Sequence, residues 1–169
     1  NIENKLNNLN LKKLKNEGNG NCQFISLFQV LTKNGNNLNI DGYKPLKTYQ
    51  DLRKNIIKYL KNHKKPNGLY RAEHKNNINK TNDSKEDKVI FTRDIPNKSK
   101  YKNLKKENNY IITQSWKEYV KAMSIDGAWG DNITLEITSK LYNKKIVLLQ
   151  DKIDNIIINE NGAETIYLI

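Results

Sequence analysis

Hydrophobic residues follow two different periodicities along the sequence, a helical one through most of it and a strand-like one at its end. Apolar residues recur at i, i+3, i+4 and i+7, or close to that spacing, in four segments: 24–31, 52–60, 116–123 and 133–141. Three short apolar segments joined by Asp, Asn and Gly then follow, as expected for strands of a meander: 145–150, 155–159 and 164–169. Helices followed by a small C-terminal sheet predict an α+β fold.

The length of 169 residues is sufficient for one domain with a substantial core, and we expect a single domain over 1–169. Residues 1–16 are rich in Asn, Lys and Leu, and predict an N-terminal docking arm or a weak helix. Residues 72–109 are strongly polar and predict a surface insert. A helical lobe is expected over about 48–125.

The net charge of +12 raises the question of nucleic-acid binding, because basic patches are typical of phosphate recognition. The composition argues against that function. Asn and Lys supply 28 and 27 of the residues, a bias spread over the whole chain. Arginine, whose guanidinium makes bidentate contacts to phosphates and bases, occurs only three times. We therefore expect a solvated basic surface and regard nucleic acid as an unlikely partner, with a basic nucleic-acid-binding domain kept as an alternative.

Simple counts exclude several protein classes. The apolar run Ile146–Leu149 has only four residues, whereas about 20 are needed to span a bilayer. The first residues are polar, so no cleavable leader is expected. The single cysteine, Cys22, excludes an intramolecular disulfide and a multi-cysteine zinc site. We expect a protein that is cytoplasmic or otherwise intracellular, with no membrane contact, no metal and no cofactor.

Cys22 lies where a nucleophile is favoured. It follows the turn Gly18-Asn19-Gly20-Asn21 and precedes the first predicted helix. Unpaired N–H groups and the positive end of the helix dipole stabilise a thiolate there, and the turn can direct backbone N–H groups at a developing oxyanion. The alternative is a buried structural cysteine, since free cysteine is among the most buried residue types.

Four blocks of sequence resemble, in order, the ovarian-tumour-domain (OTU) family of cysteine proteases. Gly18-Asn19-Gly20-Asn21-Cys22-Gln23-Phe24 is similar to the family's active-site signature, Asp-Gly-Asn-Cys-Leu/Gln-Phe. The remaining blocks are Tyr49–Arg53, then Ser115–Tyr119 with Met123, then Gly127–Asp131 with Leu135–Ile137 and Tyr142–Val147. The resemblance implies an OTU-like, papain-type fold whose small C-terminal β-sheet is flanked by helices. It implies a thiol-dependent deubiquitinase that cleaves after the C-terminal Gly-Gly of ubiquitin or a ubiquitin-like protein.

The resemblance also implies roles for single residues. Cys22 is the expected nucleophile, and Asn19 occupies the position of a catalytic aspartate. Gly20 and Asn21 belong to the turn whose N–H groups hold the oxyanion. Trp129 and Gly130 border the channel for the tail of the substrate, although Trp129 can equally be an apolar plug under its loop. The implied partners are ubiquitin, polyubiquitin or a ubiquitin-like protein.

Two departures from the family pattern bear on activity. The family has Asp three residues before the cysteine, and Asn19 keeps its hydrogen bonding without the negative charge. The family's general base is a histidine just after the last strands, and neither His63 nor His74 has that context. We expect the base to lie beyond Ile169, so that the sequence stops just before it. The alternative is a catalytically degenerate OTU domain that only binds ubiquitin.

Overall fold

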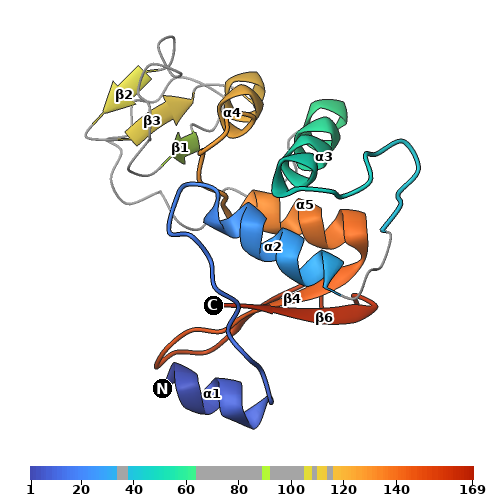
Figure 1. The fold of residues 1–169 in the computed structure, drawn as a ribbon. Coiled ribbons are helices and arrows are strands. Elements are labelled where there is room, and N and C mark those ends of the chain that lie inside the picture. The colour runs from blue at the N-terminus through green and yellow to red at the C-terminus, as the bar shows by residue number, and fades with distance from the viewer. Residues whose placement is uncertain (34–37, 64–88, 92–104, 108–109, 114–115) are drawn as a thin grey trace.

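The computed structural model of the chain (Figure 1) describes residues 1–33, 38–63 and 116–169, together with the backbone of 89–91, 105–107 and 110–113. The described helices are α1 (Ile2–Asn8), α2 (Cys22–Thr32), α3 (Tyr49–Asn62), α4 (Trp116–Met123) and α5 (Asn132–Tyr142). The described strands are β1 (Val89–Phe91), β2 (Lys105–Glu107), β3 (Tyr110–Thr113), β4 (Lys144–Leu148), β5 (Ile156–Ile158) and β6 (Glu164–Leu168). The α+β class is confirmed. Most of the predicted insert at 72–109 lies outside the described residues.

Local capping sets where α3 and α5 begin. At α3, Thr48 Oγ1 accepts a hydrogen bond from the Asp51 N–H at 3.4 Å, and the Asp51 carboxylate accepts one from the Thr48 N–H at 3.0 Å. Asp131 and Thr134 form the same reciprocal arrangement at the start of α5. Both helices therefore begin where a side chain satisfies N–H groups that have no partner within the helix.

The main core lies between the helices and one face of the C-terminal sheet. α2 packs against α3 and against β6, and α5 packs against β4. The largest side chains with essentially no exposed surface come from the helices and from β4: Tyr119, Phe24, Leu27, Leu52, Ile56, Leu60, Met123, Ile137 and Ile146. α2 is thereby held between α3 and the sheet, which fixes the position of its first residue.

The C-terminal sheet is not the predicted meander. Its strand order is β5-β4-β6, with β5 antiparallel and β6 parallel to β4. The segment between β5 and β6 crosses the start of β4, where the Ala163 N–H donates to the Asn143 carbonyl at 3.0 Å. Gly162 permits this crossing, because a Cβ there would lie 2.1 Å from the Lys145 nitrogen.

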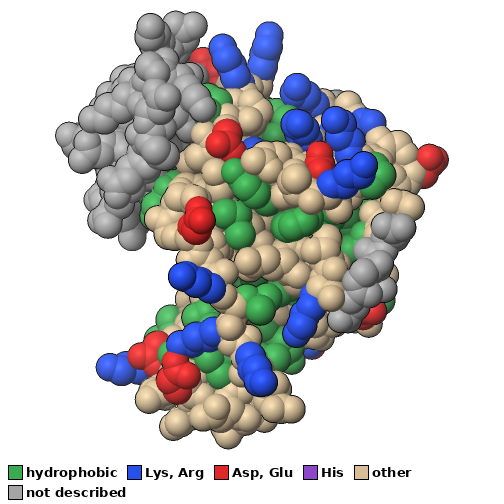
Figure 2. Space-filling view, in the orientation of Figure 1, with side chains coloured by type: hydrophobic (Ala, Val, Ile, Leu, Met, Phe, Trp, Pro, Cys, Tyr) green, Lys and Arg blue, Asp and Glu red, His purple; other side chains and the backbone are tan. Residues whose placement is uncertain are grey.

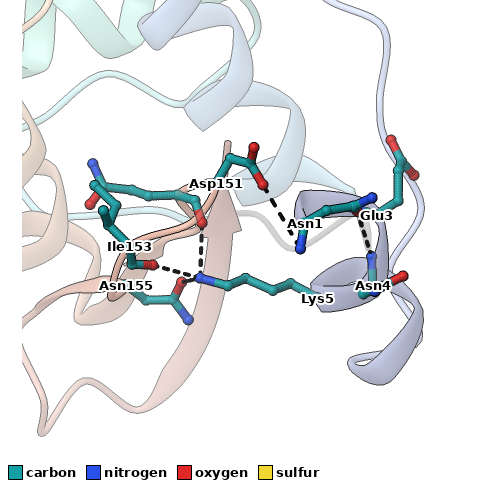
Figure 3. A network of polar contacts seen from close by, with 8 residues as sticks. Asn1, Glu3, Asn4, Lys5, Asp151, Ile153 and Asn155 are labelled. Atoms are coloured by element: carbon teal, nitrogen blue, oxygen red, sulfur yellow. Dashed lines mark hydrogen bonds and ion pairs between the residues drawn. The ribbon is translucent and has the colours of Figure 1, made fainter.

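β4 is the central strand of this sheet, and both of its faces are covered. Ile146 belongs to the main core, whereas Val147 packs with Leu6 of α1 on the opposite face. α1 is fastened there by Lys5, whose ammonium donates to the carbonyls of Gln150 and Ile153 at 2.8 and 2.7 Å (Figure 3). The sheet thus lies between α1 and the layer formed by α2 and α5 (Figure 1).

A second sheet interrupts the predicted helical lobe. Its strand order is β1-β3-β2, with both neighbours antiparallel to β3. Thr113, which stands three residues before the helix predicted at 116–123 and could have capped it, is instead the last residue of β3. The reason is that Tyr110-Ile111-Ile112-Thr113 is a run of aromatic and β-branched residues, which favour strands.

None of the helices in the described part of the chain is long and apolar enough to cross a membrane.

Candidate active site

Cys22 is the first residue of α2 and is partly exposed. Asn19 closes the turn before it. The Asn19 carbonyl accepts a hydrogen bond from the Cys22 N–H at 3.0 Å, and Asn19 Oδ1 accepts one from the Asn21 N–H at 2.9 Å. This side-chain bond is that of an Asx turn, which a neutral amide makes as well as a carboxylate does. Asn19 therefore fixes the backbone that carries Cys22.

Asn21 stands at the N-cap position of α2, yet its side chain caps no N–H of that helix. The buried amide is turned toward other elements. Its oxygen accepts hydrogen bonds from Arg53 Nη2 at 2.7 Å and from the Gly127 N–H at 2.9 Å, and its nitrogen donates to the Tyr49 hydroxyl at 3.2 Å. Asn21 thus leaves the first N–H groups of α2 without a side-chain cap, at the end of the helix where Cys22 lies.

The loop between α4 and α5 forms a second wall beside this turn. Gly127 has a φ of +86°, a conformation that glycine adopts easily, and a Cβ on Gly20 would lie 1.9 Å from the Gly127 oxygen. A Cβ on Gly130 would lie 1.8 Å from Gln23 Oε1. Trp129, between these two contacts, is 41% exposed. It is therefore a surface side chain next to the turn, and it does not plug the core under the loop.

Gln23, the second residue of α2, joins this helix to the start of α5. Its Oε1 accepts a hydrogen bond from Thr134 Oγ1 at 2.6 Å, and its Nε2 donates to the Asp131 carbonyl at 3.3 Å. Asp131 also accepts a hydrogen bond from the Tyr119 hydroxyl at 2.7 Å. Burial raises the pKa of Asp131 above its ordinary value, although the hydrogen bonds from Thr134 and Tyr119 act in the opposite direction. Asp131 thus works as a structural anchor of the second wall.

Tyr49 lies where α3 meets both walls. Its hydroxyl accepts the hydrogen bond from Asn21 and donates to the exposed carboxylate of Asp126 at 3.4 Å. Burial first, and then the charge and hydrogen bond of Asp126, raise the pKa of Tyr49 above its ordinary value. The hydroxyl consequently keeps its proton at neutral pH and remains a donor to Asp126.

Comparison with known families agrees with this geometry. The family model of the OTU-like cysteine proteases matches residues 17–167, which is nearly the whole chain. The chain belongs to the OTU-like cysteine protease family. The OTU-like fold implied by the sequence blocks is thereby confirmed. A search of curated proteins found no significant match.

The structure brings the predicted site residues of this OTU-like domain into two adjoining segments, one on each wall. The first holds Asn19, Gly20, Asn21 and Cys22, and the second holds Trp129 and Gly130. Sequence reasoning assigned no role to Arg53 or Tyr49, which connect the two segments. For Arg53 the sequence held one signal of a buried role: this charged residue directly follows Leu52, which belongs to the apolar stripe of the helix predicted at 52–60.

The described part of the chain places no histidine beside Cys22. His63 follows the last residue of α3, is exposed, and bonds through Nδ1 to the Tyr59 carbonyl at 2.8 Å. Its ring also stacks on Tyr59, with 3.8 Å between the centroids. His74 lies outside the described residues. Within the described ranges, no group of three or more His, Cys, Asp or Glu side chains is arranged to hold a metal ion.

Gly20→Ala should disrupt the site because the added Cβ would collide with backbone, which cannot move aside as a flexible side chain can. The added Cβ would lie 1.9 Å from the Gly127 oxygen, so the turn and the loop must separate. We expect a loss of about 1–3 kcal/mol in the free energy of unfolding. We expect roughly 100-fold slower turnover, the size of effect that follows a displacement of about 1 Å at a reacting group. Thermal melting would measure the loss of stability and initial rates of hydrolysis the loss of turnover. The rate of alkylation of Cys22 by iodoacetamide would show whether the thiol itself is disturbed.

Gly18→Ala is the matched control in the same turn. A Cβ at Gly18 meets no atom within 4 Å, and its φ lies outside the positive range. Stability and alkylation rate should therefore stay at the wild-type level. Equal effects of the two substitutions would contradict the close approach of Gly20 to Gly127.

Proposed function

We propose that the chain is a thiol-dependent deubiquitinase that cleaves the isopeptide or peptide bond after the C-terminal Gly-Gly of ubiquitin or a ubiquitin-like protein. The observation that carries the proposal is the pairing of Cys22 with a loop held against it at two points. Gly127 meets Gly20 and Gly130 meets Gln23, so the loop that carries the exposed residue Trp129 adjoins the turn before Cys22. A substrate tail of two glycines suits a site with such closely spaced walls, since glycine adds no side chain.

The proposed reaction forms a thioester on the cysteine. Cys22 Sγ attacks the glycine carbonyl carbon, the C–N bond breaks, and the amine leaves with a proton supplied by the general base in its acid form. Water then hydrolyses the thioester and releases the carboxylate, which restores the thiol. Each step passes through an oxyanion that backbone N–H groups stabilise.

The hydrogen bonds of the turn narrow the choice of oxyanion donor. The N–H groups of Asn21 and Cys22 already donate to Asn19. The Gly20 N–H makes no hydrogen bond with the described residues. Of the two residues whose N–H groups the resemblance implies as donors, Gly20 and Asn21, we therefore assign the oxyanion of the proposed mechanism to the N–H of Gly20.

The general base is proposed to be a histidine that follows β6, as the resemblance to the family implies. Two features of the fold support this position. α2 packs against β6, and the start of α2 and the end of β6 lie toward the same side of the molecule in Figure 1. A residue directly after β6 would therefore lie toward the end of α2 that carries Cys22.

A ubiquitin probe with an electrophile at its C-terminus tests the substrate. We expect one ubiquitin to be attached covalently at Cys22, as peptide mass spectrometry would detect, and no adduct with Cys22→Ala. The matched control is a probe in which the penultimate glycine is replaced by alanine, which should react much more slowly because the walls approach too closely for a side chain. If iodoacetamide alkylates Cys22 but neither the ubiquitin probe nor a ubiquitin-like probe labels it, the proposed substrate class is wrong.

A domain that only binds ubiquitin would give a different result with the same reagent. It would retain the probe reversibly, so that the complex dissociates in denaturant.

Lysines are exposed along α3, at Lys54, Lys58 and Lys61, and Figure 2 shows Lys and Arg side chains gathered over that helix. This basic surface is separate from the nucleophile turn and is not used in the proposed mechanism.

A further inference from the structure

Arg53 is a buried charged residue with an unusual set of partners. It lies on the inner face of α3 and is only 3% exposed. Its Nη1 donates to the Met123 carbonyl at 2.9 Å, and its Nη2 donates to Asn21 Oδ1 at 2.7 Å and to the Ala128 carbonyl at 2.8 Å. Its guanidinium carbon is 3.7 Å from the ring centroid of Phe24.

These partners belong to different parts of the candidate active site. Asn21 directly precedes the nucleophile, Ala128 lies beside Trp129 in the second wall, and Met123 ends α4 just before that wall. One nitrogen, Nη2, contacts both Asn21 and Ala128. The guanidinium is therefore a direct link between the two segments that form the site.

We propose that Arg53 is a positioning residue for Cys22. By holding Asn21 Oδ1 and the Ala128 carbonyl at fixed places, it sets the backbone of the nucleophile turn and its spacing from the second wall. In this role it acts on Cys22 through its hydrogen bond to Asn21, the residue directly before the thiol. The inference deepens the proposed function. Its consequence for ubiquitin hydrolysis rests on that function, whereas the effect on the reactivity of Cys22 does not.

The geometry requires a guanidinium in particular. A planar fork with several N–H donors can bond to three oxygens at once and stack on an aromatic ring. The ammonium of lysine keeps the positive charge but is a compact group that cannot reproduce this arrangement. Leaving a buried carbonyl without a donor also costs free energy, so the turn and the loop should rearrange in Arg53→Lys.

The test is the rate at which iodoacetamide alkylates Cys22 at pH 7 under native conditions, which requires no substrate and no base from elsewhere in the chain. We expect Arg53→Lys to lower this rate about tenfold in protein that melts cooperatively. Asn21→Ala, which removes the acceptor and keeps the arginine, should have a similar effect. The double variant should be no slower than either single one, since residues that act through one contact give non-additive effects.

Asn55→Ala is the matched control on the same helix. Asn55 is 2% exposed and its amide nitrogen donates to the Lys44 carbonyl and the Tyr142 hydroxyl, away from the nucleophile turn. It should lower the melting temperature while leaving the alkylation rate unchanged. If Asn55→Ala slows alkylation as much as Arg53→Lys, the arginine has only a general structural role and the proposal is overturned.

The same variants separate this inference from the proposed function. If Cys22 is alkylated slowly in Arg53→Lys and rapidly in the wild type, the positioning role is supported even when no ubiquitin probe labels the wild type. In that case only the substrate class is wrong. Wild-type alkylation rates in both Arg53→Lys and Asn21→Ala overturn the positioning role, whatever the ubiquitin probe shows. With an active chain, Arg53→Lys should lower kcat more than it changes KM, because a displaced nucleophile slows the chemical step more than it weakens substrate binding.

Discussion

Cys22→Ala should lower the rate of hydrolysis of a ubiquitin–fluorophore conjugate by at least about 10³-fold, measured in the most active form of the chain. In the proposed mechanism the Cys22 thiol forms the covalent intermediate, and alanine offers no nucleophile in its place. The fold should be retained, because Cys22 is partly exposed and makes its hydrogen bond through the backbone N–H, which alanine keeps. Initial rates and thermal melting would measure the two properties on the same sample.

The control for this prediction is Cys22→Ser, which preserves the size of the side chain. A hydroxyl at the same place is a much poorer nucleophile than a thiolate at neutral pH, so we expect hydrolysis to be lost here as well. Both variants should still bind ubiquitin without covalent attachment. Since Cys22 is the single cysteine of residues 1–169, hydrolysis by this segment that survives in Cys22→Ala would rule out the proposed thiol mechanism.

Helices were predictable from the sequence because their signals are local. Thr48 and Asp51 lie three residues apart, as do Asp131 and Thr134, and each pair forms the cap that its spacing indicates. The apolar stripe at 24–31 likewise identified α2, whose Phe24 and Leu27 have no exposed surface. The position of Cys22 at the start of a helix followed directly from these patterns.

The order of strands could not be read from the same kind of signal. Alternation of apolar residues indicates which faces of a strand are covered, but it does not identify the neighbouring strand. The β5-β4-β6 order depends on the crossing at Gly162, whose meaning becomes clear only from its approach to the Lys145 nitrogen. A meander was the simpler prediction for strands joined by short turns, and it was wrong for this reason.

The hydrogen bonds that connect the parts of the candidate site could not be predicted from the sequence for a related reason. The hydrogen bond from Gly127 to Asn21 joins residues 106 positions apart, and that from Arg53 to Asn21 joins residues 32 positions apart. Motif matching placed the partners in the right blocks without indicating that they touch. The sequence therefore indicated the turn that carries Cys22 as a candidate site, whereas the structure was needed to relate it to the loop that carries Trp129.

The second large effect is expected on the rate of hydrolysis when the general base is absent. If a histidine after β6 is the base, residues 1–169 should fold and bind ubiquitin, yet hydrolyse the ubiquitin–fluorophore conjugate about 10³-fold or more slowly than a chain that continues through such a histidine. The reason is that loss of one member of a catalytic unit removes most of its rate enhancement. Steady-state rates of the two forms, with matched circular dichroism spectra, would measure the difference.

The outcome also bears on the two histidines within residues 1–169. Equal rates would place the base inside this segment and make His63 or His74 the candidate. His63→Ala and His74→Ala would then be compared, although His63 is held at the end of α3 by the Tyr59 carbonyl and ring. A slow short form whose rate recovers on extension, and falls again when the added histidine is replaced by alanine, would assign the proton transfer to a residue delivered by β6 to the start of α2.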